Sequence, residues 1–282
     1  MIIDGRAIAA EIEKEIQSQI AAANGRKPCL GVILVGTHPP SHLYVRAKIK
    51  ACERVGMISI QRFLDHDTPE NIVLEEIQKF NQDPTVDGIL VQLPLPPHIN
   101  AQKIIHAISP NKDVDGLHPL NAGKLLTGDS SGFVPCTPLG IKVLLERSGI
   151  SPSGRHVVIL GRSNLVGKPM AALMMQNAPG ANATVTIAHS HTQKLQELCL
   201  LADILIAAIG QPKFVTADMV KAGAVVVDVG INKLGDRLVG DVDFENVKDK
   251  CGAITPVPRG VGPMTIAMLL SNTLKSYIHS MR

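Results

Sequence analysis

Short apolar runs alternate with helical patterns along almost the whole chain, and this alternation predicts the class of fold. In the first part, apolar runs at 30–35, 58–64 and 88–93 predict strands, and the segments at about 41–55 and 69–81 have helical periodicity. The strands are apolar throughout, which is typical of parallel strands that helices cover on both faces. The order of strand, helix and strand therefore predicts an α/β fold with a parallel sheet and right-handed crossovers.

A second series of alternating strand and helix patterns follows a stretch that is rich in Pro and Gly. Residues 94–138 contain seven Pro and four Gly with little periodicity, which is typical of a linker or a functional loop region. Beyond it, the strands and the last helix are predicted at 156–160, 184–188, 204–208, 225–229 and about 263–278. We therefore predict two α/β domains. The first covers residues 1–138 and is completed by the C-terminal helix at 263–282, and the second covers residues 139–262.

The N-terminal segment predicts an amphipathic helix that packs on a domain. Ile8, Ile12, Ile16 and Ile20 recur every four residues, and charged residues lie between them. The segment lacks the basic start and apolar stretch of a signal peptide, and no apolar run approaches the roughly 20 residues that a membrane span needs. We therefore expect a cytoplasmic protein that does not bind a membrane.

Charge, aromatic content and cysteine spacing exclude several classes of function. The net charge is only +3 over 282 residues, with no Trp, two Tyr and five Phe, so the chain offers neither the basic stripe nor the stacking platform that nucleic acid requires. The five cysteines are far apart and form no C-x-x-C pair, so we expect no metal site and no disulfide framework. Isolated cysteines of this kind mostly serve as small buried hydrophobic residues.

The strand at 156–160 runs directly into a glycine turn that predicts an anion site. The turn begins at Gly161 and leads into an apolar helix, and the backbone N–H groups and dipole of such a helix start attract phosphate. Gly161 permits a tight turn, and Gly167 permits close packing of the helix on the strand. The spacing departs from G-x-G-x-x-G, because Ser163 stands at the second glycine and Gly167 comes one residue late. An ordinary strand-to-helix turn is the alternative.

The end of the next strand indicates which dinucleotide this turn binds. Sites that prefer NAD place an acidic residue there to bind the ribose hydroxyls. Here the strand at 184–188 is followed by His189-Ser190-His191-Thr192, which contains no acid. Arg162 and Ser190 can instead hold a ribose 2′-phosphate by charge-assisted hydrogen bonds. We therefore predict NADP as the cofactor, and we interpret the two histidines as solvated turn residues.

Four polar residues of the first domain form a candidate chemical site. Tyr44 and Lys48 lie four residues apart on one predicted helix, so they project from the same face. Gln92 lies in the apolar run that Pro94 interrupts, and a buried amide needs partners. Asp115 lies in a polar loop. Because ligands bind at the carboxyl ends of the strands in open α/β sheets, these groups can form a polar site for an uncharged heterocycle. The alternative for Lys48 is an ordinary solvated lysine.

Together these segments resemble the methylenetetrahydrofolate dehydrogenase/cyclohydrolase family, and the resemblance covers essentially the whole chain. The segments that carry it are Tyr44-Val45-Arg46-Ala47-Lys48, Val91-Gln92-Leu93-Pro94-Leu95, Lys112-Asp113-Val114-Asp115-Gly116, Pro135-Cys136-Thr137-Pro138, residues 161–169, Asp228-Val229-Gly230-Ile231-Asn232, Gly240-Asp241-Val242-Asp243 and residues 256–265. The resemblance implies a folate-binding N-terminal α/β domain and a Rossmann-like NADP-binding domain, with the active site in the cleft between them. It also implies a homodimer and tetrahydrofolate substrates, including polyglutamylated forms.

The resemblance further assigns roles to single residues. It makes Lys48 the central acid–base group, Tyr44 its neighbour and Gln92 the group that hydrogen-bonds and tunes it, while Asp115 binds the amino-pyrimidine edge of the folate. The cofactor contacts that it implies are Gly161, Arg162, Ser163, Ser190, Ile231 and Thr137. The further substrate contacts that it implies are Pro258, Gly260 and Thr265. The implied reactions are oxidation of methylenetetrahydrofolate with NADP and hydrolysis of the methenyl product, as part of one-carbon metabolism.

One position departs from the family pattern. The family usually reads Pro-Gly-Gly-Val-Gly-Pro-Met-Thr, and here Arg259 replaces the first glycine. We expect Arg259 to point to solvent with compatible backbone angles, and the alternative is that its cation meets the glutamate tail of folate. Two other functions remain open, an NADP dehydrogenase of another class and a protein that binds NADP without catalysis. Neither requires Tyr44, Lys48, Gln92 and Asp115 at these spacings.

Overall fold

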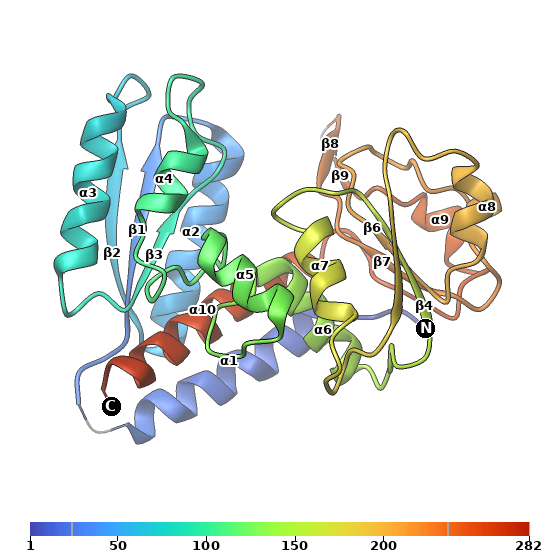
Figure 1. The fold of residues 1–282 in the computed structure, drawn as a ribbon, viewed down its shortest axis with the longest axis horizontal. Coiled ribbons are helices and arrows are strands. Elements are labelled where there is room, and N and C mark those ends of the chain that lie inside the picture. The colour runs from blue at the N-terminus through green and yellow to red at the C-terminus, as the bar shows by residue number, and fades with distance from the viewer. Residues whose placement is uncertain (24, 236, 282) are drawn as a thin grey trace. The chain divides into compact units, whose positions relative to one another are not determined.

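The computed structural model describes residues 1–23, 25–235 and 237–281, which fold into two compact units (Figure 1). The three-stranded unit comprises Ala10–Cys136 and Ile266–Arg282. The five-stranded unit comprises Met1–Ala9 and Thr137–Thr265. Among the described residues, no helix is long and apolar enough to cross a membrane.

The three-stranded unit is a parallel sheet in the order β2-β1-β3. Its elements are β1 (Cys29–Val35), α2 (Pro39–Val55), β2 (Ile58–Leu64), α3 (Glu70–Gln82), β3 (Gly88–Val91), α4 (Ala101–Ala107) and α5 (Pro119–Thr127), together with most of α1 (Gly5–Ala22) and α10 (Val261–Ser280). One face of the sheet packs against α3 and α4, and this core includes Ile33, Ile77 and Ile104. Cys29 and Val35 of β1 belong to the same core. Since strand side chains alternate between faces, Leu30, Val32 and Leu34 point to the opposite face, and all seven residues of β1 are buried.

The predicted buried side of α2 is correct at its C-terminal end, where Ala51 and Val55 are buried, and wrong at its N-terminal end. The spacing of Leu43, Ala47, Ala51 and Val55 predicts that Leu43 is buried, but this side chain is 67% exposed and Val45 is buried in its place. Two prolines open the helix, and Gly56 ends it in the left-handed conformation. The buried stripe runs through Val45, Ala51, Cys52 and Val55, and Leu43 lies outside it.

The Pro- and Gly-rich stretch is folded structure and not a linker. It contains α4 and α5 and ends at the start of α6 (Cys136–Arg147). The side chain of Asn100 accepts hydrogen bonds from the backbone N–H groups of Gln102 and Lys103, and His118 Nδ1 accepts one from Leu120 N. These caps start two helices that are too short to show clear periodicity in the sequence.

The five-stranded unit is a parallel sheet in the order β10-β7-β6-β4-β5, with a separate β8–β9 hairpin. Its elements are β4 (His156–Leu160), α7 (Gly167–Met174), β5 (Thr184–Ala188), α8 (Leu195–Leu200), β6 (Ile204–Ala207), the 3-10 helix η1 (Ala217–Met219), β7 (Val225–Asp228), β8 (Asn232–Leu234), β9 (Arg237–Val239), α9 (Phe244–Val247) and β10 (Ala253–Ile254), together with α6. The chain adds β5 on one side of β4 and then returns to place β6 on the other. This reversal is the switch point at which doubly wound sheets bind ligands.

The first nine residues belong to the five-stranded unit, whereas the predicted boundaries place them in the first domain. Ile2 forms a parallel bridge with Ile254, and Ile3 N donates to Ile254 O at 2.8 Å. The terminal ammonium donates to Gly252 O at 2.8 Å. The chain start thus extends the sheet beyond β10, and a backbone pairing of this kind leaves no side-chain pattern by which it could be predicted.

Candidate functional site

The structure brings Lys48 and Gln92 together in the three-stranded unit. Lys48 lies half-buried on α2, and its Nζ donates a hydrogen bond of 3.0 Å to Gln92 Oε1. The Nε2 of Gln92 donates to Leu93 O at 2.6 Å. This second bond fixes which end of the amide faces the lysine, so Gln92 is an acceptor toward Nζ and orients the amine.

Gln92 itself lies just past the strand in which the sequence places it. The strand β3 ends at Val91. Gln92 is the next residue, and its backbone N–H still donates a hydrogen bond of 2.9 Å to Ile33 O of β1. Gln92 is therefore not a buried strand residue but a half-buried one at the carboxyl end of β3. This position gives its side chain access to the ligand edge of the sheet.

Asp115 lies in a turn that buried groups hold rigidly. The neighbouring Asp113 is 1% exposed and accepts hydrogen bonds from Leu117 N, His118 N and the side chain of Asn121. Burial raises the pKa of Asp113 to about 6, although these three donors act in the opposite direction. Asp115 is half-buried, so its carboxylate remains accessible at the surface of a fixed turn.

Cys136 and Asn272 are two residues of this site that the sequence analysis did not assign to it. Cys136 Sγ donates to Val114 O at 3.3 Å, and Asn272 Nδ2 donates to Val114 O and Val134 O at 2.8 and 3.1 Å. Burial and then the charge of Asp115 raise the pKa of Cys136 well above its usual value, while the charge of Lys48 acts in the opposite direction. The thiol therefore stays protonated and is not a nucleophile. An Asn inside the apolar C-terminal helix is the signal that could have indicated this role of α10.

Tyr44 lies one helical turn before Lys48 and is 39% exposed. Burial of part of the ring raises the pKa of Tyr44 above its ordinary value. The phenol is therefore neutral at physiological pH and can donate a hydrogen bond, but it is not a base. Tyr44, Lys48 and Gln92 thus form one polar surface over the carboxyl edge of the three-stranded sheet.

The predicted cofactor turn in the five-stranded unit is a tight backbone contact. Gly161 has a φ of +111°, and a Cβ at this residue would overlap the carbonyl oxygen of Ala208, which follows β6. A Cβ at Gly167 would likewise overlap the carbonyl oxygen of Gly161. Both glycines therefore meet a steric requirement, and the turn lies at the switch point between β4 and β6.

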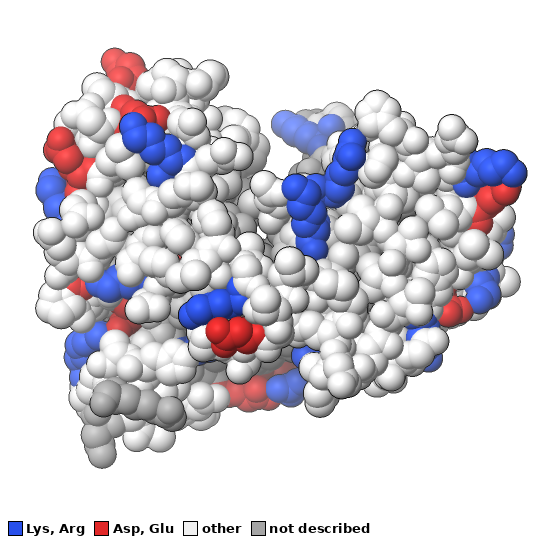
Figure 2. Space-filling view, viewed as in Figure 1, with Lys and Arg blue, Asp and Glu red and all other residues white. Residues whose placement is uncertain are grey.

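The helix that follows the turn presents its N-terminus to a ligand. No side chain caps α7 at Val166, whereas Ser163 Oγ accepts from Val166 N at 3.1 Å within the turn. Arg162 and Lys168 are exposed beside it. Figure 2 shows Lys and Arg side chains gathered near the start of α7 and the β8–β9 hairpin. This positive surface around a helix N-terminus suits a ligand with several phosphates.

The carboxyl end of β5 has the features that the NADP prediction requires. Ser190 is exposed, and no acidic residue occurs from His189 through Thr192. His189 N donates to Thr192 Oγ1 at 2.9 Å, which closes a local turn that presents Ser190. The glycine contacts, the helix start and this turn all fit a bound dinucleotide phosphate.

The remaining predicted residues lie in the five-stranded unit. The hydroxyls of Thr137 and Thr265 are 3.0 Å apart and hydrogen-bonded, which ties the start of α6 to α10. Pro258 is exposed, and Gly260 is buried where a Cβ would lie 2.5 Å from the carbonyl oxygen of Pro256. Ile231 is 45% exposed between β7 and the β8–β9 hairpin.

The backbone of Arg259 does not have the compatible angles that the sequence analysis predicts. Its φ is +90°, a conformation that favours glycine, while its guanidinium forms an exposed ion pair of 2.5 Å with Asp4. Asp4 also accepts from Arg6 N and Ala7 N at the start of α1, and these contacts lower the pKa of Asp4. The prediction that the side chain lies at the surface is confirmed, but its backbone is strained.

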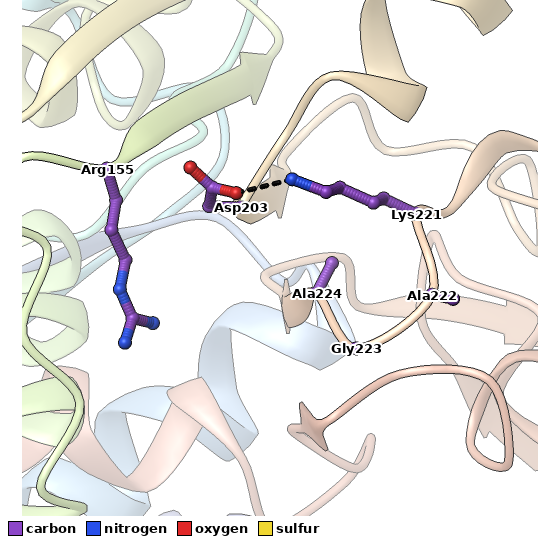
Figure 3. Close-up of a pocket in the computed structure, with 6 residues that line it drawn as sticks. All are labelled: Arg155, Asp203, Lys221, Ala222, Gly223 and Ala224. Carbon is purple, nitrogen blue, oxygen red and sulfur yellow. Dashed lines mark hydrogen bonds and ion pairs between the residues drawn. The ribbon is translucent and has the colours of Figure 1, made fainter.

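A shallow pocket at the amino ends of β4, β6 and β7 contains none of the predicted residues (Figure 3). Arg155, Asp203 and Lys221 line it together with Ala222, Gly223 and Ala224. The Asp203 carboxylate already accepts from Lys221 Nζ at 2.6 Å and His156 N at 2.9 Å. Because this is the edge opposite the glycine turn, we do not assign the pocket to the site.

Two family models match the chain over most of its length. The model described as "Tetrahydrofolate dehydrogenase/cyclohydrolase, catalytic domain" matches residues 3–115. The model described as "Tetrahydrofolate dehydrogenase/cyclohydrolase, NAD(P)-binding domain" matches residues 135–281. The first match contains Tyr44, Lys48, Gln92 and Asp115, and the second contains the glycine turn.

Individual relatives are similar over the whole chain. The bifunctional protein FolD of Protochlamydia amoebophila is 59% identical, over 99% of this chain and 98% of the relative. The crystal structure of the FolD methylenetetrahydrofolate dehydrogenase/cyclohydrolase of Campylobacter jejuni is 47% identical with a TM-score of 0.95, and covers 99% of both chains. The Trypanosoma brucei enzyme, solved with NADP cofactor and inhibitor, is 38% identical with a TM-score of 0.94, over 100% of this chain and 98% of the other.

Proposed function

Because this chain belongs to the tetrahydrofolate dehydrogenase/cyclohydrolase family, we infer that it catalyses two successive steps of one-carbon metabolism. It oxidises 5,10-methylenetetrahydrofolate to 5,10-methenyltetrahydrofolate with NADP, and it hydrolyses the product to 10-formyltetrahydrofolate. The single observation that carries the second activity is the hydrogen bond between Lys48 Nζ and Gln92 Oε1. It presents an oriented amine at the ligand edge of the sheet, which a protein that only binds NADP does not need.

Hydrolysis is the step that needs proton transfer. Water adds to the methenyl carbon and loses a proton, which leaves a hydroxyl on that carbon. The hydroxyl then loses its proton as the formyl C=O bond forms, the bond from the carbon to N5 breaks, and N5 is protonated. The products are 10-formyltetrahydrofolate and one released proton. We assign two of these transfers to Lys48, which can accept a proton from the attacking water and return one to N5. Gln92 holds the amine in place, and Tyr44, as a neutral phenol, donates a hydrogen bond to the substrate.

Oxidation depends on orientation more than on proton transfer. Bound NADP supplies the hydride acceptor, and the electron pairs of the folate nitrogens assist the departure of the hydride. We propose that Gly161, Arg162 and Ser163 bind the pyrophosphate region, that Ser190 and Arg162 bind the 2′-phosphate, and that Thr137 and Ile231 contact the rest of the cofactor. The steric contacts of Gly161 and the lack of an acid after β5 support these assignments.

We propose that Asp115 anchors the amino-pyrimidine edge of folate, and that Pro258, Gly260 and Thr265 complete the substrate contacts. The rigid turn around Asp113 supports the first assignment. Asp115→Ala should raise the Michaelis constant for folate in both reactions by about 10- to 100-fold, since a charged hydrogen bond contributes about 1.5–3 kcal/mol. Steady-state kinetics of each reaction measure this, and a change in only one of them would contradict the anchor role.

A single spectrophotometric assay tests the function. Purified protein is mixed with methylenetetrahydrofolate and either NADP or NAD, and the absorbance of the reduced cofactor and of the methenyl product is followed. We expect reduction with NADP to exceed that with NAD, followed by decay of the methenyl absorbance. No cofactor reduction with either dinucleotide would overturn the dehydrogenase assignment.

We propose that the protein is a homodimer in which β2 pairs with the same strand of a second copy. β2 is an edge strand, and Ile58 and Phe63 on it are 47% and 56% exposed. Ile58 and Phe63 point to opposite faces of the sheet. On the Phe63 face, His42 of α2 stacks on the Phe63 ring, and the next residue, Leu43, is 67% exposed. Edges of this kind are normally protected by charge or covered by a partner.

Light scattering of the purified chain tests the dimer. Phe63→Lys should give a monomer, while Leu201→Lys, an equally exposed site in the five-stranded unit, should leave the mass unchanged. A wild-type protein that is monomeric at micromolar concentration would overturn the proposal. We also propose a cytoplasmic location and the use of polyglutamylated folates, which cell fractionation and kinetics with mono- and polyglutamylated substrates would test.

A further inference from the structure

Two buried carboxylates lie near each other at the carboxyl ends of the strands of the five-stranded sheet. Asp228 ends β7 and is 2% exposed, and Asp241, beyond the β8–β9 hairpin, is fully buried. Burial raises the pKa of Asp228 to about 7, and the charge of Asp241 acts in the same direction. Burying two acids together is costly unless their oxygens find donors. Their contacts therefore indicate what they hold in place.

Asp241 ties together two loops at the carboxyl ends of the strands. Its Oδ2 accepts from Ile209 N at 2.7 Å and Gly210 N at 2.9 Å, directly after β6. Its Oδ1 accepts from Asn232 Nδ2 at 2.9 Å. The first of these loops begins with Ala208, whose carbonyl oxygen packs on Gly161. One carboxylate thus links the wall of the glycine turn to the residue that follows Ile231.

Asp228 fixes the same region from the other side. Its Oδ1 accepts from Gly230 N at 3.0 Å and Asp241 N at 2.8 Å, and its Oδ2 accepts from Val242 N at 3.0 Å. Asp228 N donates to the hydroxyl of Thr255 at 2.8 Å. The backbone on both sides of Ile231 is therefore held, at Gly230 through Asp228 and at Asn232 through Asp241.

Two glycines make room for the pair. A Cβ at Gly230 would overlap the Asp241 carboxylate, and a Cβ at Gly240 would overlap the Asp228 carboxylate. Neither glycine has a φ in the left-handed region, so conformational freedom does not explain them. The close approach of their backbone to the two carboxylates explains why glycine is required at both positions.

We propose that Asp228 and Asp241 are positioning residues of the NADP site, which hold the 208–210 loop and the 229–232 segment in the geometry that receives the cofactor. The proposal rests on the NADP binding inferred above. It predicts that these carboxylates govern cofactor affinity without touching the folate chemistry, because Lys48 and Gln92 lie in the three-stranded unit.

Asp241→Asn is the first test. Both oxygens of Asp241 accept hydrogen bonds from N–H groups. In the Asn variant the side-chain NH2 replaces one oxygen and faces an N–H donor, so neither group has an acceptor. We expect the dissociation constant for NADP, measured by calorimetry, to rise about tenfold or more, since an unmatched buried donor costs 1–3 kcal/mol. Hydrolysis of methenyltetrahydrofolate in the absence of NADP should stay within about twofold of wild type.

Asp243→Asn is the matched control. Asp243 is two residues from Asp241 and pairs with Lys213 and Asn246, so its substitution should leave NADP affinity within about twofold of wild type. Asn232→Ala, which removes only the half-buried donor, should raise the NADP dissociation constant severalfold and keeps the test decisive if Asp241→Asn fails to fold. Wild-type affinity for NADP in a folded Asp241→Asn, or in Asn232→Ala, would overturn the positioning role. Absence of NADP binding by the wild-type chain would instead overturn the proposed function.

Discussion

The two units build their sites by different physical means. In the three-stranded unit, side chains from distant segments converge, and Lys48 Nζ and Gln92 Oε1 meet at 3.0 Å. In the five-stranded unit, the glycine turn requires residues without a side chain, because Gly161 packs against the backbone of Ala208 and Gly167 packs against the backbone of Gly161. The first region brings polar side chains together, and the second leaves backbone N–H groups and space.

This difference determines how each region responds to substitution. If Lys48 has the proposed role, its removal should abolish a proton transfer but leave the surrounding backbone intact. Adding a side chain at a glycine contact shifts backbone, and it should affect binding before chemistry. Lys48→Met and Gly161→Ala test this distinction directly, while Asp113→Asn and Arg259→Gly test the stability of one turn in each unit.

Lys48→Met should reduce the cyclohydrolase rate by about 10³-fold, since positioned acid–base groups contribute 10²–10⁴-fold. NADP affinity should stay within about twofold, because the glycine turn lies in the other unit. Rates with methenyltetrahydrofolate and calorimetry with NADP measure the two effects. Lys50→Met, two residues away and exposed, is the control that should change neither. A Lys48→Met enzyme with a near-normal cyclohydrolase rate would remove Lys48 from the mechanism.

Asp113→Asn should change the pH dependence of stability. Burial raises the pKa of Asp113 from 3.8 to about 6 in the folded protein, so its stabilising contribution is complete below about pH 4 and is lost as the pH rises through 6. The free energy of unfolding should therefore fall by up to about 3 kcal/mol more in the wild type than in the variant between pH 4 and 7. Urea titrations at several pH values measure this. If the stabilities of the two proteins changed in parallel with pH, the pKa of Asp113 would not be raised in the folded protein.

Gly161→Ala should weaken NADP binding about 100-fold through its positive φ and its overlap with Ala208. Gly149→Ala separates the two causes, because Gly149 also has a positive φ, of +70°, but open space around its Cβ position. It should lose only about 1–2 kcal/mol of stability and keep its NADP affinity. Cyclohydrolase activity without NADP should survive in both variants. Unchanged NADP affinity in Gly161→Ala would show that the turn does not contact the cofactor.

Arg259→Gly should have the smallest effect. Relief of the positive φ should stabilise the protein by about 1 kcal/mol, and loss of the exposed ion pair with Asp4 should offset up to about the same amount. We expect a net change below about 1 kcal/mol in thermal unfolding. Affinity for polyglutamylated folate should not change, because the Arg259 guanidinium already pairs with Asp4. A weaker affinity of the variant for polyglutamylated folate would support the alternative that Arg259 contacts the glutamate tail.

Periodicity predicted most elements of the fold because buried strands and helices must carry apolar residues at fixed intervals. The strands β4 and β5 begin and end where they are predicted. The short helices α4 and α5 were missed because one or two turns with proline nearby give too few repeats to detect. The exposure of Leu43 was also missed, since an apolar side chain at an edge that a partner can cover looks like a core residue in the sequence.

The sequence by itself predicted two α/β domains and the glycine turn, because these follow from local periodicity and from glycines at characteristic spacings. It offered Tyr44, Lys48, Gln92 and Asp115 as candidate site residues through their resemblance to a known family. Only the tertiary structure decided that Asn272 and Cys136 support the Asp115 turn, that Ile2 and Ile3 pair with Ile254 of the five-stranded sheet, and that Asp228 and Asp241 hold the loops beside Gly161. The physical reason is that these are hydrogen bonds between segments far apart in the chain. Such contacts depend on how the strands are ordered in space, and this order leaves no periodic trace in the sequence.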